Sequence, residues 1–229
     1  MIAAGAAFLA FLLVGSADAR EAVTAKRFMV AAAHPLAAQA GYDVLARGGS
    51  AVDAAIAVQM VLGLVEPESS GIGGGAFLLH WSQSERRLRS YDGRETAPMA
   101  ARPDRFFRDG KPMAFMDAVV GGRSVGVPGV LRMLELAHQQ HGRLPWAELF
   151  RPAIEAAEQG FALSPRLHAV LQDEQFLRED AAARDIYYGK AIGTRIVNRE
   201  YGATLRALAA RGASSARRSA SPGCSGMPA

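Results

Sequence analysis

The sequence has almost no cysteine, and it has no long apolar run beyond its first residues. The one cysteine among 229 residues is Cys224, so the chain can form no intramolecular disulfide. A disulfide-rich secreted scaffold is therefore excluded, and the fold must depend on a hydrophobic core. Half of the residues are apolar and 21% are charged, which is typical of a soluble globular protein with such a core.

Clusters of basic residues and internal repeats are also missing. The formal net charge is +4, and the excess lysines and arginines are scattered along the chain. Because a nucleic-acid-binding surface needs clustered basic residues, no nucleic-acid partner is expected. The length and the lack of a repeat indicate one domain or a large piece of one.

An apolar stretch near the N-terminus, residues 2–14, has no lysine or arginine before it. Its 13 residues are fewer than the roughly 20 that a membrane-spanning helix needs. Ala17-Asp18-Ala19 then forms an A-x-A cleavage site, and the chain turns polar at Arg20. We interpret residues 1–19 as a secretory signal peptide, with an uncleaved anchor as the alternative, and we expect an exported, periplasmic protein.

Start and stop signals predict several helices. Ser50, with Asp53 three residues later, resembles a capping box, and the helix that it begins, 51–65, is apolar nearly all round. Such a helix should be deeply buried. Proline or glycine signals bound the other predicted helices, at 35–45, 130–141, 146–159, from 165 onward, and 201–211.

Short apolar segments predict strands. Residues 28–33 have the pattern of a buried strand, and 76–81 with 88–91, joined by a polar turn, have that of a hairpin. Residues 96–118 contain three prolines and should be irregular.

Two glycine motifs match known fingerprints in the wrong context. Residues 71–76 fit G-x-G-x-x-A, but a helix precedes them and a strand follows, the reverse of the order in a dinucleotide-binding fold. Residues 122–126 fit G-x-S-x-G around Ser124, but Pro128 delays the helix that should begin at the serine. The sequence therefore argues against a nucleotide site at the first motif, and it favours a tight turn at the second.

Glu135 and His138 lie three residues apart on one predicted helix, with His141 one turn further on. A dimetal site would need a second Glu-x-x-His pair, which the sequence lacks. We therefore expect no metal, and we interpret these side chains, with the neighbouring glutamines, as a solvated helix face. The other three histidines are isolated and should each be hydrogen-bonded in place: His34, His80 and His168.

Arg94 follows a predicted strand, beside Gly93 and between the acidic residues Asp92 and Glu95. A guanidinium at a strand end can bind a carboxylate with two parallel hydrogen bonds, which lysine cannot imitate. A local salt bridge with Asp92 or Glu95 explains the same residues equally well.

Several segments together resemble the N-terminal region of the gamma-glutamyltransferase family. The similarity runs in uninterrupted order over residues 28–212. The matching segments are Ala33-His34-Pro35-Leu36-Ala37, residues 44–55, Val65-Glu66-Pro67 with the glycine loop to Phe77, Tyr91 to Pro98, Ser124 to Gly129, and Gly142-Arg143-Leu144-Pro145-Trp146.

The resemblance implies an α+β fold, the αββα sandwich of the N-terminal-nucleophile hydrolases. Such enzymes cut their own precursor ahead of a threonine, which then attacks a gamma-glutamyl amide such as glutathione and uses its own amine as the base. Arg94 stands where the family binds the substrate's alpha-carboxylate, and the glycine loop 71–75 is structural. No cofactor is implied, and no membrane contact once the signal peptide is removed.

The sequence also departs from the family. Members are much longer, and their threonine-threonine-histidine motif is absent here, since Thr194 and Thr204 lack that context. We therefore expect residues 20–212 to be the N-terminal portion of the large subunit, an incomplete sandwich without the nucleophile or the small subunit. Such a chain should be inactive alone and should fold poorly, because sheet edges and apolar faces stay uncovered.

The last residues, 213–229, consist almost wholly of Ser, Gly, Pro, Ala and Arg. Such a segment should be disordered, and we interpret it as the product of a frameshift near Gly212, with an ordinary flexible terminus as the alternative. Two other functions remain open: a related acylase of the same fold, such as a cephalosporin-type acylase, or a non-catalytic exported binding protein.

Overall fold

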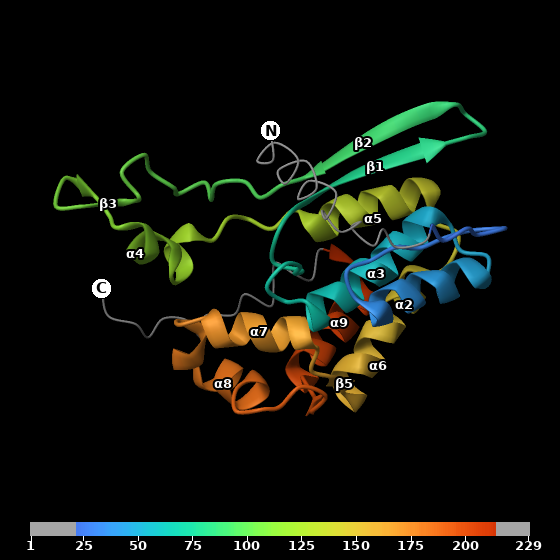
Figure 1. Cartoon of the computed structure of the whole chain (residues 1–229). Coiled ribbons are helices and arrows are strands. Elements are labelled where there is room, and N and C mark those ends of the chain that lie inside the picture. The colour runs from blue at the N-terminus through green and yellow to red at the C-terminus, as the bar shows by residue number, and fades with distance from the viewer. Residues whose placement is uncertain (1–21, 214–229) are drawn as a thin grey trace, which may run out of the picture.

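The computed structural model describes residues 22–213 (Figure 1). The predicted signal peptide, 1–19, and nearly all of the predicted tail lie outside these residues. Ala213, the first residue of that tail, is buried, and its N–H donates to the Glu135 carboxylate at 3.2 Å.

A helical body carries most of the core. Helix α3 (Ala51–Val65) packs against α2 (Pro35–Ala46), α5 (Val130–His141), the 3-10 helix η3 (Trp146–Phe150) and α6 (Arg151–Gln159), while α9 (Arg199–Arg211) packs against α6 and η3. Side chains from these helices are fully buried, among them Ile56, Met60, Leu64, Phe150 and Leu205. The prediction that the helix from residue 51 to 65 is deeply buried is confirmed.

The starts of the helices at Pro35, Ala51, Val130 and Pro165 are those that the sequence signals predict, whereas α9 begins at Arg199, two residues before its predicted start. Ser50 and Asp53 form both halves of the capping box, with the Ser50 N–H donating to Asp53 at 2.8 Å and the Asp53 N–H donating to Ser50 at 3.1 Å. Asn198 caps α9 in the same way, through the Tyr201 N–H at 3.0 Å. Each cap supplies an acceptor to a backbone donor that has no partner within the helix.

A second group of short elements follows α6. Strands β5 (Phe161–Ala162) and β6 (Arg195–Ile196) pair antiparallel, and between them lie α7 (Pro165–Asp173), the 3-10 helix η4 (Leu177–Glu179) and α8 (Ala181–Tyr187). Ser164 caps α7 through the Leu167 N–H, and Pro165 occupies its first turn, as predicted.

Strands β1 (Ala76–Ser82) and β2 (Arg87–Gly93) form the predicted antiparallel hairpin, which lies along α5 in Figure 1. One face of the hairpin, with Tyr91, packs on α5. The other face exposes its apolar side chains, namely Phe77, Leu79, Trp81 and Leu88, which are 52–70% exposed. No described residue covers this apolar hairpin face.

Residues 96–127 form an arm that extends away from the helical body (Figure 1). It carries β3 (Phe107–Arg108), β4 (Lys111–Pro112), α4 (Phe115–Val119) and the 3-10 turn η2 (Gly122–Ser124). Two backbone hydrogen bonds between Thr96 and Val127, at 2.8 and 3.3 Å, close the arm at its base.

The predicted strand at residues 28–33 is wrong. No described strand pairs with these residues, residue 33 is a bend, and Met29 is 53% exposed. Apolar composition alone cannot make a strand, because the backbone groups need a neighbouring ladder.

Candidate functional site

Arg94 lies directly after the last residue of β2, where the hairpin meets the helical body. Its backbone N–H donates to Asp92 Oδ1 at 2.9 Å, which fixes the turn out of the strand. The guanidinium Nη1 lies 3.0 Å from Glu95 Oε2, and the Arg94 side chain is 59% exposed. Within the described part of the chain, the guanidinium makes no other ion pair or hydrogen bond.

A hollow of about 360 Å³ opens beside Arg94. Its wall combines Arg94 and Asp92 with the start of α5, which contributes Arg132 and Glu135. These two side chains form an ion pair at 3.7 Å, so the α5 side of the hollow is close to neutral. The sequence left open whether Arg94 binds a carboxylate ligand or forms a local salt bridge. The two roles are compatible, because Arg94 is paired with Glu95 and also lines a hollow.

Glycines make room for the backbone of Arg94. A Cβ atom added at Gly75 would lie 2.8 Å from Arg94 Cα, and one added at Gly129 would lie 2.8 Å from the Arg94 carbonyl oxygen. The Gly74 carbonyl also accepts hydrogen bonds from the N–H groups of Gly129 and Val130, at 3.1 and 3.2 Å. Loop 71–75 and the start of α5 therefore clamp the end of β2, which is a structural use of glycine.

Glu95 is wedged into the same junction. A Cβ at Gly126 would lie 2.8 Å from Glu95 Cβ, and a Cβ at Gly75 would lie 2.6 Å from Glu95 Oε2. Oε2 is buried and makes no well-directed hydrogen bond, so its contact with Arg94 is an ion pair of imperfect geometry. The pair engages only one of the donors of Arg94, and an arginine has five.

Two of the hydroxyl groups that the sequence singled out, those of Ser124 and Thr204, have backbone partners. Ser124 Oγ donates to the Val119 carbonyl at 2.6 Å, which agrees with a tight turn and not with a nucleophile elbow. Thr204 Oγ1 donates to the Glu200 carbonyl at 3.1 Å, one helical turn back. Neither hydroxyl lies against a base that could activate it.

The interpretation of Glu135, His138 and His141 as solvated is wrong: these side chains are half-buried, because α5 packs against both α3 and the hairpin, whereas the two neighbouring glutamines are exposed as expected. His138 Nε2 lies 2.9 Å from the Leu144 carbonyl and 3.6 Å from Asp53 Oδ1. Glu135 holds the Ala213 N–H.

His80 is not isolated. Its ring stacks on that of His141 with centroids 4.1 Å apart, and Tyr91 Oη lies 2.8 Å from His141 Nε2 and donates to Gln140 at 2.7 Å. The pKa of His141 is lowered, first by burial and then by the positive charges of His80 and Arg89. His80 and Tyr91 lie on the same face of the hairpin, which the alternation of side chains along its strands could have predicted. Their contact with the helix α5 could not be predicted in that way.

Metal-binding and membrane-spanning features were also sought in residues 22–213. No group of three His, Cys, Asp or Glu side chains there is placed to hold a metal ion. No helix in this range is both long and apolar enough to cross a bilayer.

Comparison with known proteins shows the family to which this chain belongs. The family model for gamma-glutamyltranspeptidase matches residues 37–217, a range that includes Arg94 and all of its glycine contacts. The chain belongs to the gamma-glutamyltranspeptidase family. The glutathione hydrolase proenzyme of Bacillus subtilis is 38% identical over 189 residues, which cover 80% of this chain and 32% of the relative. The family includes acylases too: the Acylase ACY 1 proenzyme of a Pseudomonas strain is 36% identical over 204 residues, covering 84% of this chain and 36% of the relative.

The fold agrees with that family. The crystal structure of Helicobacter pylori gamma-glutamyltranspeptidase matches with a TM-score of 0.77 and 27% identity, over 83% of this chain and 56% of that chain. The α+β, N-terminal-nucleophile hydrolase class predicted from sequence is confirmed, as part of the full fold. The chain spans about a third of the length of these two curated relatives.

Proposed function

We propose that this chain supplies the residue that binds the substrate's alpha-carboxylate, Arg94, to a gamma-glutamyl hydrolase or transferase. The observation that carries the proposal is the placement of Arg94: it stands at a strand end, lines a hollow and gives only one contact to Glu95. A substrate carboxylate entering the hollow can take two parallel hydrogen bonds from the remaining donors.

The clamp around Arg94 supports this role. A binding residue needs its backbone fixed, and Arg94 is held by Asp92 through its N–H and by the close approach of Gly75 and Gly129. Glu95 then keeps the guanidinium oriented in the absence of substrate. Glutathione and other gamma-glutamyl amides are the proposed substrates.

The chain does not catalyse by itself, in this proposal. The attacking threonine comes from a small subunit that acts as the partner of this chain, and the hydroxyls of Ser124 and Thr204, which are bonded to backbone carbonyls, do not replace it. Residues 1–19 direct export to the periplasm.

A chromogenic gamma-glutamyl anilide tests this absence of catalysis. Neither the purified wild-type chain nor its Arg94→Ala variant should release dye above the buffer rate. Dye release by the wild-type chain that disappears in Arg94→Ala, but persists in the surface control Arg102→Ala, would show that the chain is an active enzyme. Arg102 suits the control because it pairs with Asp104 and is 79% exposed, on the arm.

The role of Arg94 is tested separately by ligand binding. L-glutamine is the simplest gamma-glutamyl amide, and 4-aminobutanamide differs from it only by lacking the alpha-carboxylate. L-glutamine signals should broaden in NMR spectra with the wild-type chain and with Arg102→Ala, but not with Arg94→Ala. Equal broadening by both ligands would contradict the proposal. An acylase that ignores the alpha-carboxylate, the second candidate suggested by the ACY 1 relative, predicts that equality.

A further inference from the structure

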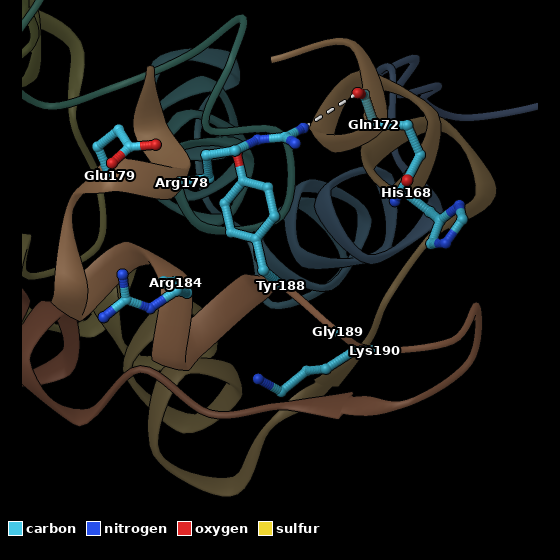
Figure 2. A pocket seen from close by; sticks show the side chains of 8 residues that line it. All are labelled: His168, Gln172, Arg178, Glu179, Arg184, Tyr188, Gly189 and Lys190. Carbon is cyan, nitrogen blue, oxygen red and sulfur yellow. Dashed lines mark hydrogen bonds between the residues drawn. The ribbon is translucent and has the colours of Figure 1, made fainter. Parts of the chain in front are cut away.

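A second hollow, of about 670 Å³, lies among α7, η4, α8 and the turn that follows α8 (Figure 2). It shares no lining residue with the hollow beside Arg94. Its volume falls within the roughly 300–1,000 Å³ that is usual for small-molecule sites. Neither the proposed function nor the family match requires anything to bind there.

Three cationic side chains line this second hollow: Arg178 from η4, Arg184 from α8 and Lys190 from the following turn. Glu179 is the one carboxylate among its lining residues, so the wall carries a net formal charge of +2. Such a wall attracts anions and repels cations.

None of the three cations is neutralised by a carboxylate among the described residues. Arg178 donates to the carbonyls of Gln172 and Glu174, at 3.3 and 3.1 Å, and Lys190 donates to the Asp185 carbonyl at 2.6 Å. Arg184 makes no ion pair within residues 22–213. In the part of the chain that the structure describes, other arginines, such as Arg105 and Arg123, also bond only to backbone carbonyls, so what distinguishes this hollow is that three such cations lie around one concave place.

Two ring side chains complete the wall. His168 lines it from α7, and Tyr188 lies under the Arg178 guanidinium, with 5.7 Å from the guanidinium carbon to the ring centroid. The Tyr188 hydroxyl is buried, makes no well-directed hydrogen bond, and lies close enough to Arg178 for the two groups to interact. Because burial raises its pKa, it stays an O–H donor at neutral pH.

We infer that this hollow is a binding site for a small multivalent anion, either a phosphate group or a polycarboxylate. Arg184 and Lys190 supply the charge, Arg178 holds the wall through its bonds to two backbone carbonyls, and Tyr188 offers its hydroxyl. A polymeric anion would need basic residues spread along a surface, whereas these gather in one concave place.

Isothermal titration of the full chain with inorganic phosphate, and separately with citrate, tests this inference in a low-salt chloride buffer. We expect saturable binding to one site by at least one of the two anions. Arg184→Gln and Lys190→Gln should each weaken that binding roughly tenfold, the usual loss for one charge-assisted hydrogen bond. Lys190→Arg, which keeps the charge, should restore most of the affinity.

Arg102→Gln is the matched control, because it removes the same charge from the distant arm. It should leave the affinity unchanged, and far-UV circular dichroism should be the same for all variants. Arg178 is left intact, since its removal would also disconnect η4 from α7. If Arg184→Gln alone proves misfolded, Lys190→Gln compared with Lys190→Arg decides the outcome.

Tighter binding of phosphate than of citrate assigns the site to phosphate groups, and the reverse order assigns it to polycarboxylates. The inference is overturned if neither anion binds saturably, or if Arg102→Gln weakens binding as much as the two pocket variants do. The L-glutamine experiment on Arg94 is independent of this result, because the two hollows share no residue.

Discussion

Asp53 is the buried charge whose removal should damage the fold most. Its carboxylate is fully buried, and Oδ2 accepts hydrogen bonds from three backbone N–H groups: Ser50 at 2.8 Å, Arg143 at 2.9 Å and Leu144 at 3.1 Å. One of these bonds belongs to the capping box of α3, and the other two attach the loop after α5 to the start of α3. Asp53 therefore joins α3, the central helix, to the end of α5, the helix whose start lies beside Arg94.

The cost of Asp53→Ala can be estimated from these bonds. Losing the Asp53 half of the capping box costs about 1 kcal/mol, and leaving the part-buried donors of residues 143 and 144 without a partner costs about 1–2 kcal/mol each. We expect a loss of about 3–5 kcal/mol in the free energy of unfolding, a large share of the stability of a domain of this size. Asp53→Asn keeps one acceptor oxygen but loses the charge, so it should cost about half as much.

Urea unfolding followed by tryptophan fluorescence measures these losses. Trp146 is a suitable reporter, because its ring lies against His138 and its N–H donates to the Leu208 carbonyl at 3.0 Å. Asp43→Ala is the matched control: its carboxylate contacts only Gln39 on the surface of α2, so it should change stability by less than about 0.5 kcal/mol. A loss below about 1 kcal/mol for Asp53→Ala would refute the reasoning.

Two further predictions concern the hairpin. Its uncovered apolar face should make the chain self-associate, so sedimentation velocity should show larger species as concentration rises; Leu79→Lys should reduce them, and a strictly monomeric wild-type chain would contradict this. The lowered pKa of His141 means that the folded state binds a proton less readily than the unfolded chain. The contribution of this group to the free energy of unfolding is therefore complete above about pH 6.5 and falls as the pH drops below it. Unfolding curves at about pH 7.5 and 5.5 should show this loss of stability, and His141→Gln should make it smaller.

Local signals in the sequence predicted the longer helices and the hairpin, but not the short helices α4 and α8. The capping box at Ser50, the proline at residue 165 and the glycine at 142 act through neighbouring residues, so the pattern that forms them is visible in the sequence. The first turn of the helix predicted at 146–159 is a 3-10 turn, with the α-helix beginning at Arg151. Such differences at helix ends are expected of any prediction from local pattern.

Features that depend on long-range contacts were missed. Residues 28–33 look like a strand but have no described partner, and His138 looks solvated but meets Asp53 from another helix. The cations of the second hollow come from three successive short elements, and no motif marks them. The position of Arg94 after a strand singled it out in the sequence, and the family resemblance decided between its two interpretations. Its glycine clamp depends on loop 71–75 and on the start of α5, which only the fold brings together.

The central claim is that the Arg94 guanidinium binds the alpha-carboxylate of a gamma-glutamyl group. The most direct measurement is the ¹⁵N NMR signal of its Nε–H group, assigned by its absence in Arg94→Lys. Saturating L-glutamine should shift this signal, whereas 4-aminobutanamide at the same concentration should leave it in place. An Arg94 signal that responds to neither ligand, or equally to both, would contradict the account.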